Sequence, residues 1–293
     1  MGERKFVMDN FKEAKKVGLI GIIGNIFLLV IKFTVSFLSK SQGMLADSLN
    51  SLIDIFSSFM TYLGSKISSK PKDENHAFGH EKAEYIFSLI ISLFMMLISI
   101  NVFKGALISL INHDKFIFSY KLIFICIITI LIKLCLYLYT KKVYNKTSNI
   151  IIKANMEDHK NDILLTSSTA IGIIMGKIDI YFLDSIIGMI IPIFIIINAV
   201  KLAIESSKVL MDQNLSREEL EAISKIALSN EKVLHIDSIA AKPMGAKFLI
   251  ILKVSMDGSI TLYDSHKESG KIKEEIMKYN NLVADVVIHT NPE

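Results

Sequence analysis

The sequence predicts an α-helical membrane protein of six transmembrane helices, followed by a small C-terminal cytoplasmic α/β domain with a ferredoxin-like αββαβ order. Two observations lead to this fold class. Of the 293 residues 51% are hydrophobic, and the mean hydropathy of +0.45 is too high for an ordinary soluble domain. Several windows reach the roughly 20 apolar residues that cross a bilayer as a helix. The apolar composition ends near residue 207, so we expect a transmembrane domain over 1–206 and a cytoplasmic domain over 207–293.

The six expected spans are apolar windows of helical length. They cover residues 17–38, 43–64, 85–111, 117–140, 156–177 and 180–205. The first, third, fourth and sixth are the plainest membrane spans, whereas the second contains Asp47 and Asp54, and the fifth contains Glu157, Asp158 and Asp162. Because backbone in lipid must satisfy its own hydrogen bonds, helices are the expected spanning form.

Basic residues gather on one side of the predicted membrane. They lie before the first span and in the loops after the second and fourth, at Arg4, Lys5, Lys12, Lys15, Lys16, Lys66, Lys70, Lys72, Lys82, Lys141, Lys142, Lys146 and Lys153. The opposite loops hold only Lys40, Lys115, Lys121 and Lys177. The positive-inside rule therefore puts both termini in the cytoplasm, and we expect a bacterial inner or plasma membrane.

Short patterns predict the elements of the C-terminal domain. A capping box from Ser216 to Glu219 begins an amphipathic helix. Residues 246–256 and 282–290 read as strands, and 265–279 as a helix between them. A domain of this size is too short for a large enzyme core but adequate for a sensor or dimerisation module.

Two polar pairs interrupt the second and fifth windows. Asn50 and Asp54 are four residues apart, as are Asp158 and Asp162, and this spacing puts each pair on one helix face. Buried charge in a membrane is costly and usually marks an ion path or a proton relay. If the faces meet, they offer four oxygen-bearing side chains, which suit a hard divalent cation such as Mn²⁺. Zinc usually prefers imidazole or thiolate.

The plainer alternative for both pairs is a set of carboxylates that are solvated or salt-bridged at a membrane edge. Asp47 lies on the same stripe, seven residues before Asp54. It could support the site by lining the path of ions or protons, or it could only bond a neighbouring helix. Lys32 and Lys133, inside the first and fourth windows, either extend to an interface or pair with acidic groups.

A polar loop between the second and third windows carries Asp73, His76 and His80, at spacings of three and four. This spacing can gather ligands on one helical face or turn, and one Asp with two His can hold a divalent metal. The alternative is that these are idle exposed side chains.

Three stretches together resemble the cation diffusion facilitator family, in particular its manganese branch. They read "GMLADSLNSLID", "NMEDHKND" and "DENHAFGHEKAE". The resemblance covers essentially the whole chain. It implies a homodimeric secondary active transporter in the lipid bilayer, not an enzyme, that exports divalent metal from the cytoplasm in exchange for protons. We expect no cofactor besides the transported metal and no nucleic acid partner.

By position, four residues match the transport site of the family: Asn50, Asp54, Asp158 and Asp162. Zinc-carrying members typically have His in this quartet. The resemblance therefore implies Mn²⁺ as the cargo, with Zn²⁺, Fe²⁺, Co²⁺ and Cd²⁺ as alternatives.

The resemblance implies two further metal sites. Asp73, His76 and His80 match the loop site of the family, and His266 and His289 match two ligand positions of its cytoplasmic dimerisation and metal-sensing domain. Asp237 could complete a weaker site there. Asn291 stands where an acidic ligand is common, so a full two-metal cluster is not expected. Surface groups without metal are the alternative.

Two other functions fit parts of the pattern. One is a membrane metal sensor that does not transport, which a measurement of metal flux would distinguish. The other is an intramembrane hydrolase with paired aspartates, although no Gly-Asp-type protease motif accompanies the pairs.

Overall fold

The computed structural model describes residues 2–147, 150–245 and 247–293, without the side chains of residues 2–19, 146, 147 and 150–154. The basic side chains predicted before the first span, and those of Lys146 and Lys153, lie outside the described residues. The chain separates into two compact units. The first unit comprises residues 1–60 and 91–201, and the second comprises 61–90 and 202–293. The predicted domain division at 206 and 207 falls inside a helix and stays a prediction.

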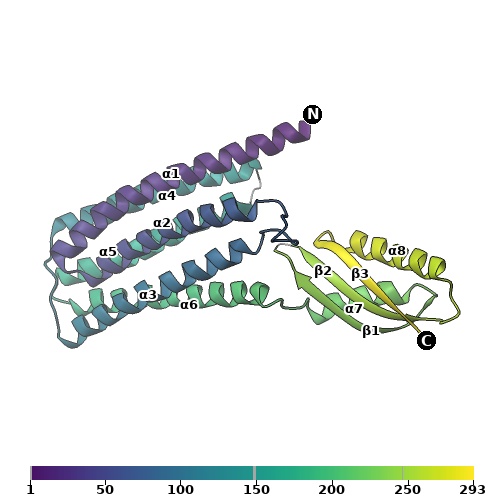
Figure 1. Cartoon of the computed structure of the whole chain (residues 1–293). Helices are drawn as coiled ribbons and strands as arrows, with labels where there is room; N and C mark the ends of the chain where they lie inside the picture. Colours follow the sequence, from purple (N-terminus) through teal and green to yellow (C-terminus); the bar gives the residue numbers. More distant parts are fainter. Residues whose placement is uncertain (1, 148–149, 246) are drawn as a thin grey trace. The chain divides into compact units, whose positions relative to one another are not determined.

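Long helices occupy the six apolar windows (Figure 1). They are α1 (Gly2–Ser39), α2 (Gln42–Ser68), α3 (Ala83–Ile111), α4 (Tyr120–Thr147), α5 (Ile150–Gly176) and α6 (Phe182–Leu210). Four of them, α1, α3, α4 and α6, contain a stretch long and apolar enough to cross a membrane, and these are the plainest windows of the sequence. The charges of α2 and α5 keep these two helices below that threshold, so the count of six spans stays a prediction.

A tight turn joins α1 to α2 and is held by a carboxylate of α6. Lys40 takes the left-handed conformation with φ of 60°, which ends α1. Asp184 then accepts hydrogen bonds from the Ser41 hydroxyl and the Gln42 backbone N–H, each at 2.7 Å. Because the first N–H groups of a helix have no partner within the helix, Asp184 supplies one and fixes the start of α2.

Apolar side chains pack α2 against its neighbours in the first unit. Ala46 and Ile53 of α2 lie in one cluster with Val102 of α3 and Ile191 of α6. On the other side, α4 packs along α5, and α1 packs on both. Large apolar side chains on the outer helix faces are exposed, for example Phe124 at 63%, as lipid-facing helices require. The polar face of α2 is thereby turned toward α5.

The C-terminal part of the second unit forms the predicted α/β domain. Its elements are α7 (Arg217–Leu228), β1 (Val233–Pro243), β2 (Phe248–Met256), α8 (Leu262–Tyr279) and β3 (Val283–Pro292), in the predicted order. The sheet has the order β1-β2-β3, with β1 and β2 antiparallel and β2 and β3 parallel.

Capping side chains set the helix starts of this domain. The capping box predicted at Ser216 is present, since Glu219 N–H donates to the Ser216 hydroxyl at 3.3 Å and the Glu219 carboxylate accepts from Ser216 N–H at 3.0 Å. The helix predicted from residue 265 begins at Leu262, because Thr261 caps it by accepting from Asp264 N–H at 3.1 Å.

Apolar side chains at every second position of β2 form the core of the domain. Ile250, Leu252 and Val254 are fully buried against Ile223 of α7 and Ile272 of α8. Since successive strand residues point to opposite faces, both helices cover the same face of the sheet.

We expect Ile250→Ala to destabilise this domain strongly and Ile251→Ala to change it little. Ile250 is fully buried, whereas its neighbour Ile251 is 37% exposed. A large-to-small substitution in a core costs about 2–5 kcal/mol, because transfer energy is lost and a cavity remains. Hydrogen exchange of the full chain, measured by mass spectrometry, should show faster exchange through β1–β3 only in the Ile250 variant. Equal acceleration in both variants would contradict this core assignment.

Candidate metal centre

The polar faces of α2 and α5 meet as their spacing predicts. Asn50 Nδ2 donates to Asp162 Oδ1 at 3.1 Å, and both residues are buried, at 9% and 5% exposure. Asn50 comes from the first half of α2 and Asp162 from the middle of α5. A direct contact therefore joins one member of each predicted pair.

Asp54 and Asp158 lie one turn away from this contact on their own helices. Asp54 is half-buried and Asp158 is exposed. The polar side chains of the two pairs therefore become more exposed toward the C-terminal end of α2 and the N-terminal end of α5. Asp54 interacts electrostatically with Asp158 and with Asp162. The three carboxylates do not converge within 4.8 Å of one another in the described part of the chain, so ligation of one ion requires side-chain movement.

A buried lysine of α4 joins the same contact. Lys133 Nζ forms an ion pair with Asp162 Oδ2 and donates to Asn25 Oδ1 at 2.6 Å. Lys133 is completely buried, and a buried charge is tolerated only when it is paired and hydrogen-bonded. Asn50 and Lys133 thus occupy both oxygens of Asp162.

A second buried ion pair lies at Asp47. Lys32 Nζ of α1 is 2.9 Å from Asp47 Oδ2, and Thr166 of α5 donates to the same oxygen at 2.9 Å. Lys32 also donates to the Thr166 hydroxyl at 3.3 Å, and all three residues are at most 1% exposed. Asp47 therefore bonds two neighbouring helices, and any additional role in lining a path stays a prediction.

Among the partners of the buried charges, Asn25 and Thr166 were not predicted from the sequence. Thr166 follows Asp162 by four residues, and Asn25 precedes Lys32 by seven, so helical spacing puts each on the face of a residue already singled out. That spacing is the signal that could have found them.

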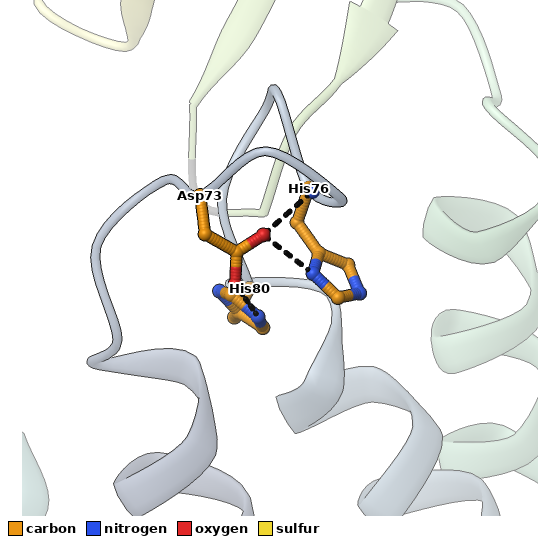
Figure 2. Close-up of side chains that lie close together, drawn as sticks. All are labelled: Asp73, His76 and His80. Atoms are coloured by element: carbon orange, nitrogen blue, oxygen red, sulfur yellow. Dashed lines mark hydrogen bonds and ion pairs between the residues drawn. The ribbon is translucent and has the colours of Figure 1, made fainter.

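The loop between α2 and α3 gathers the three predicted ligands in a turn (Figure 2). Asp73 Oδ1 lies 2.9 Å from His76 Nδ1 and accepts from His76 N–H at 2.7 Å, while Asp73 Oδ2 lies 3.4 Å from His80 Nε2. One ligand atom from each residue lies within 4.8 Å of the others, and no other group of three such side chains occurs among the described residues. The hydrogen bond from the His76 side chain lowers the pKa of Asp73, which keeps its carboxylate ionised.

The three candidate ligands of the C-terminal domain are not gathered within one protomer. Asp237 of β1 accepts from Asn291 Nδ2 at 2.9 Å and lies 3.0 Å from His235 Nε2, and its pKa is lowered chiefly by Asn291. His266 of α8 and His289 of β3 are exposed and join no three-ligand group in the described residues. The site formed by His266, His289 and Asp237 stays a prediction.

Comparison with known proteins finds matches over both parts of the chain. Residues 18–211 match the cation efflux transmembrane domain, and residues 215–293 match the cytoplasmic domain of cation efflux proteins. The manganese efflux system protein MneP of Bacillus subtilis is 28% identical over 95% of this chain and 96% of that protein. MneS, a manganese efflux system protein of the same organism, is 26% identical over 97% of each chain. The cation-efflux pump FieF of Shigella boydii is 24% identical over 90% of this chain and 88% of its own.

The ion pair between Lys32 and Asp47 predicts how substitutions of these two residues change the stability of the protein. Lys32→Met leaves a buried carboxylate unpaired, and breaking a buried pair in this way costs about 3–5 kcal/mol. Lys32→Met combined with Asp47→Asn removes both charges and should recover most of the loss. Size-exclusion chromatography of heated, purified protein gives the midpoint temperature of each variant. A matched control is Lys104→Met, at an exposed lysine of α3, which should leave that temperature unchanged. Equal midpoints for the single and double variants would contradict the pairing.

Proposed function

We propose that the chain, which belongs to the cation diffusion facilitator family of cation efflux transporters, exports Mn²⁺ from the cytoplasm in exchange for protons. Members of this family are metal cation transporters and not enzymes. The observation that carries the proposal is the contact between Asn50 and Asp162, with Asp54 and Asp158 one turn away. These four side chains are the proposed transport site.

The donor set of this site favours Mn²⁺ among the divalent metals. It contains one amide and three carboxylates, and hard oxygen ligands suit Mn²⁺, whereas Zn²⁺ prefers imidazole or thiolate. Two relatives, MneP and MneS, are named manganese efflux system proteins, which supports the same cargo. Zn²⁺, Fe²⁺, Co²⁺ and Cd²⁺ are the alternative cargoes.

The exposure of the polar side chains rises from Asn50 and Asp162 to Asp54 and Asp158, which supports entry of the metal from the cytoplasm. If α1–α6 all span with both termini inside, Asp158 and Asp54 face the cytoplasmic side, where the site is more open. The sealed triad of Lys32, Asp47 and Thr166 lies on the opposite side. We propose that metal enters past Asp158 and that the helices then rock to expose the site outward, where protons replace the metal on the carboxylates.

Two further assignments complete the proposal. The cytoplasmic domain makes the protein a homodimer, since residues 215–293 match the cytoplasmic domain of the family. Asp73, His76 and His80 form a second metal site in the loop, because their ligand atoms already converge.

Flux measurement tests the proposed function directly. Purified protein in liposomes with an acidic lumen and a metal-sensitive dye should accumulate Mn²⁺ saturably, and an ionophore that collapses the pH gradient should stop this flux. Asp54→Asn should abolish it. Competition among Mn²⁺, Zn²⁺, Fe²⁺, Co²⁺ and Cd²⁺ ranks the cargoes. Zn²⁺ flux without Mn²⁺ flux would reject the metal assignment, and metal binding without any flux would favour a sensor.

Asn50→His should shift the preference of the transporter toward zinc. The imidazole replaces a hard amide oxygen with a nitrogen ligand, so we expect the ratio of kcat/KM for Zn²⁺ over Mn²⁺ to rise about tenfold or more. Asn101→His, at an exposed asparagine of α3, is the matched control and should leave the ratio unchanged. An unaltered ratio in the Asn50 variant would count against Asn50 as a ligand.

The loop site should lose metal independently of transport. Asp73→Asn and His80→Ala each remove one of the three converging ligands, so we expect one fewer Mn²⁺ bound per chain at equilibrium dialysis, with Mn²⁺ flux retained. Glu74→Gln, at the adjacent exposed carboxylate, is the matched control. Unchanged metal content in both variants would contradict the loop site.

A further inference from the structure

Lys133 brings a positive charge into the proposed transport site. It lies on α4, which packs along α5, and its side chain is completely buried. Its ammonium pairs with Asp162 Oδ2 and donates to Asn25 Oδ1. The other buried lysine, Lys32, is instead engaged with Asp47 and Thr166, neither of which belongs to the quartet.

Each oxygen of Asp162 already has a protein donor. Its Oδ1 accepts from Asn50 Nδ2, and its Oδ2 is held by Lys133. A divalent cation ligated by Asp162 therefore has to share the carboxylate with these donors or replace one of them. An ammonium held next to the bound metal would also repel it, because like charges repel strongly where water is excluded.

We propose that Lys133 is a tethered counter-cation that competes with the transported metal for Asp162. This inference rests on the proposed transport site. When the metal takes Asp162, the ammonium keeps Asn25 Oδ1 as its acceptor, which already lies 2.6 Å from Nζ. When the metal leaves, Lys133 returns to Asp162, so this buried carboxylate does not remain unpaired.

The net charge of the proposed transport site together with Lys133 agrees with the role of Lys133 as a counter-cation. Three carboxylates and one ammonium leave two negative charges, which a single divalent cation neutralises. Lys133 thus lowers the affinity for metal while it helps the metal to leave. It is a positioning residue that acts through Asp162, and its function requires no change in its own charge.

The affinity of the full-length protein for Mn²⁺ tests the proposal. Titration followed by the electron paramagnetic resonance signal of free Mn²⁺, in an Asp73→Asn background that removes the loop site, gives Kd. Lys133→Met should lower Kd about tenfold or more, because the competing charge is gone. In liposomes the same variant should show a lower KM together with a lower kcat, since release of Mn²⁺ becomes slower. Lys133→Arg keeps the charge and should restore Kd toward the parent value.

A purely structural role for Lys133 gives a different result. Lys133→Met would then unfold the protein or leave Kd unchanged or raised, and an unchanged or raised Kd in folded protein would overturn the proposal. If this variant does not fold, Asn25→Ala decides, because it leaves every charge in place. Loss of the second acceptor commits the ammonium to Asp162, so Kd should rise, and an unchanged or lowered Kd would overturn the proposal. Lys104→Met is the matched control for loss of a lysine and should leave Kd unchanged.

Asp54→Asn separates failure of this inference from failure of the proposed function. If Mn²⁺ binding in the Asp73→Asn background survives Asp54→Asn, the transport site itself is wrong and the inference falls with it. If Asp54→Asn abolishes binding while Lys133→Met does not tighten it, the transport site stands and only the role of Lys133 is wrong.

Discussion

The cost of burying charge away from water governs how α1, α2, α4 and α5 pack. A carboxylate in a water-poor interior is stable only when a cation or several donors face it. Asp47 has Lys32, and Asp162 has Lys133, each pair coming from different helices. Each of these two buried carboxylates thus has a basic residue at the matching depth of α1 or α4. The helix arrangement and the chemistry of the site follow from the same constraint.

The same constraint shapes the proposed transport site. Asn50 and Lys133 satisfy Asp162, while Asp54 and Asp158 face the more open end. Asp47, at the buried end of the row, is instead paired with Lys32 and accepts from Thr166. The polar row on α2 therefore changes along the helix, from a closed ion pair at Asp47 to the half-buried Asp54 of the proposed site.

Local patterns in the sequence predict much of the fold and some of the site. Helical windows arise from apolar side chains adjacent in sequence, and the i,i+4 pairs are properties of one helix, so each polar face could be predicted. The cost of leaving these faces in lipid favours their meeting, as Asn50 and Asp162 do. The turn of Asp73, His76 and His80 is equally local, which is why spacing alone predicts it.

The partners of the two buried lysines could not be predicted. Nothing in the periodicity of α1 or α4 says that Lys32 meets Asp47 and that Lys133 meets Asp162, because the rotation and depth of each helix are set by packing with the others. For the same reason spacing does not tell whether His266 and Asp237, on separate elements of the C-terminal domain, approach one another.

The most direct test of the account is the position of Mn²⁺ itself. Crystals of the protein grown with Mn²⁺ and measured at the manganese absorption edge would locate the ion by its anomalous signal. The account predicts a peak between α2 and α5, ligated by Asn50, Asp54, Asp158 and Asp162, with the ammonium of Lys133 moved away from Asp162. A peak in the loop of Asp73 with none between α2 and α5 would contradict it.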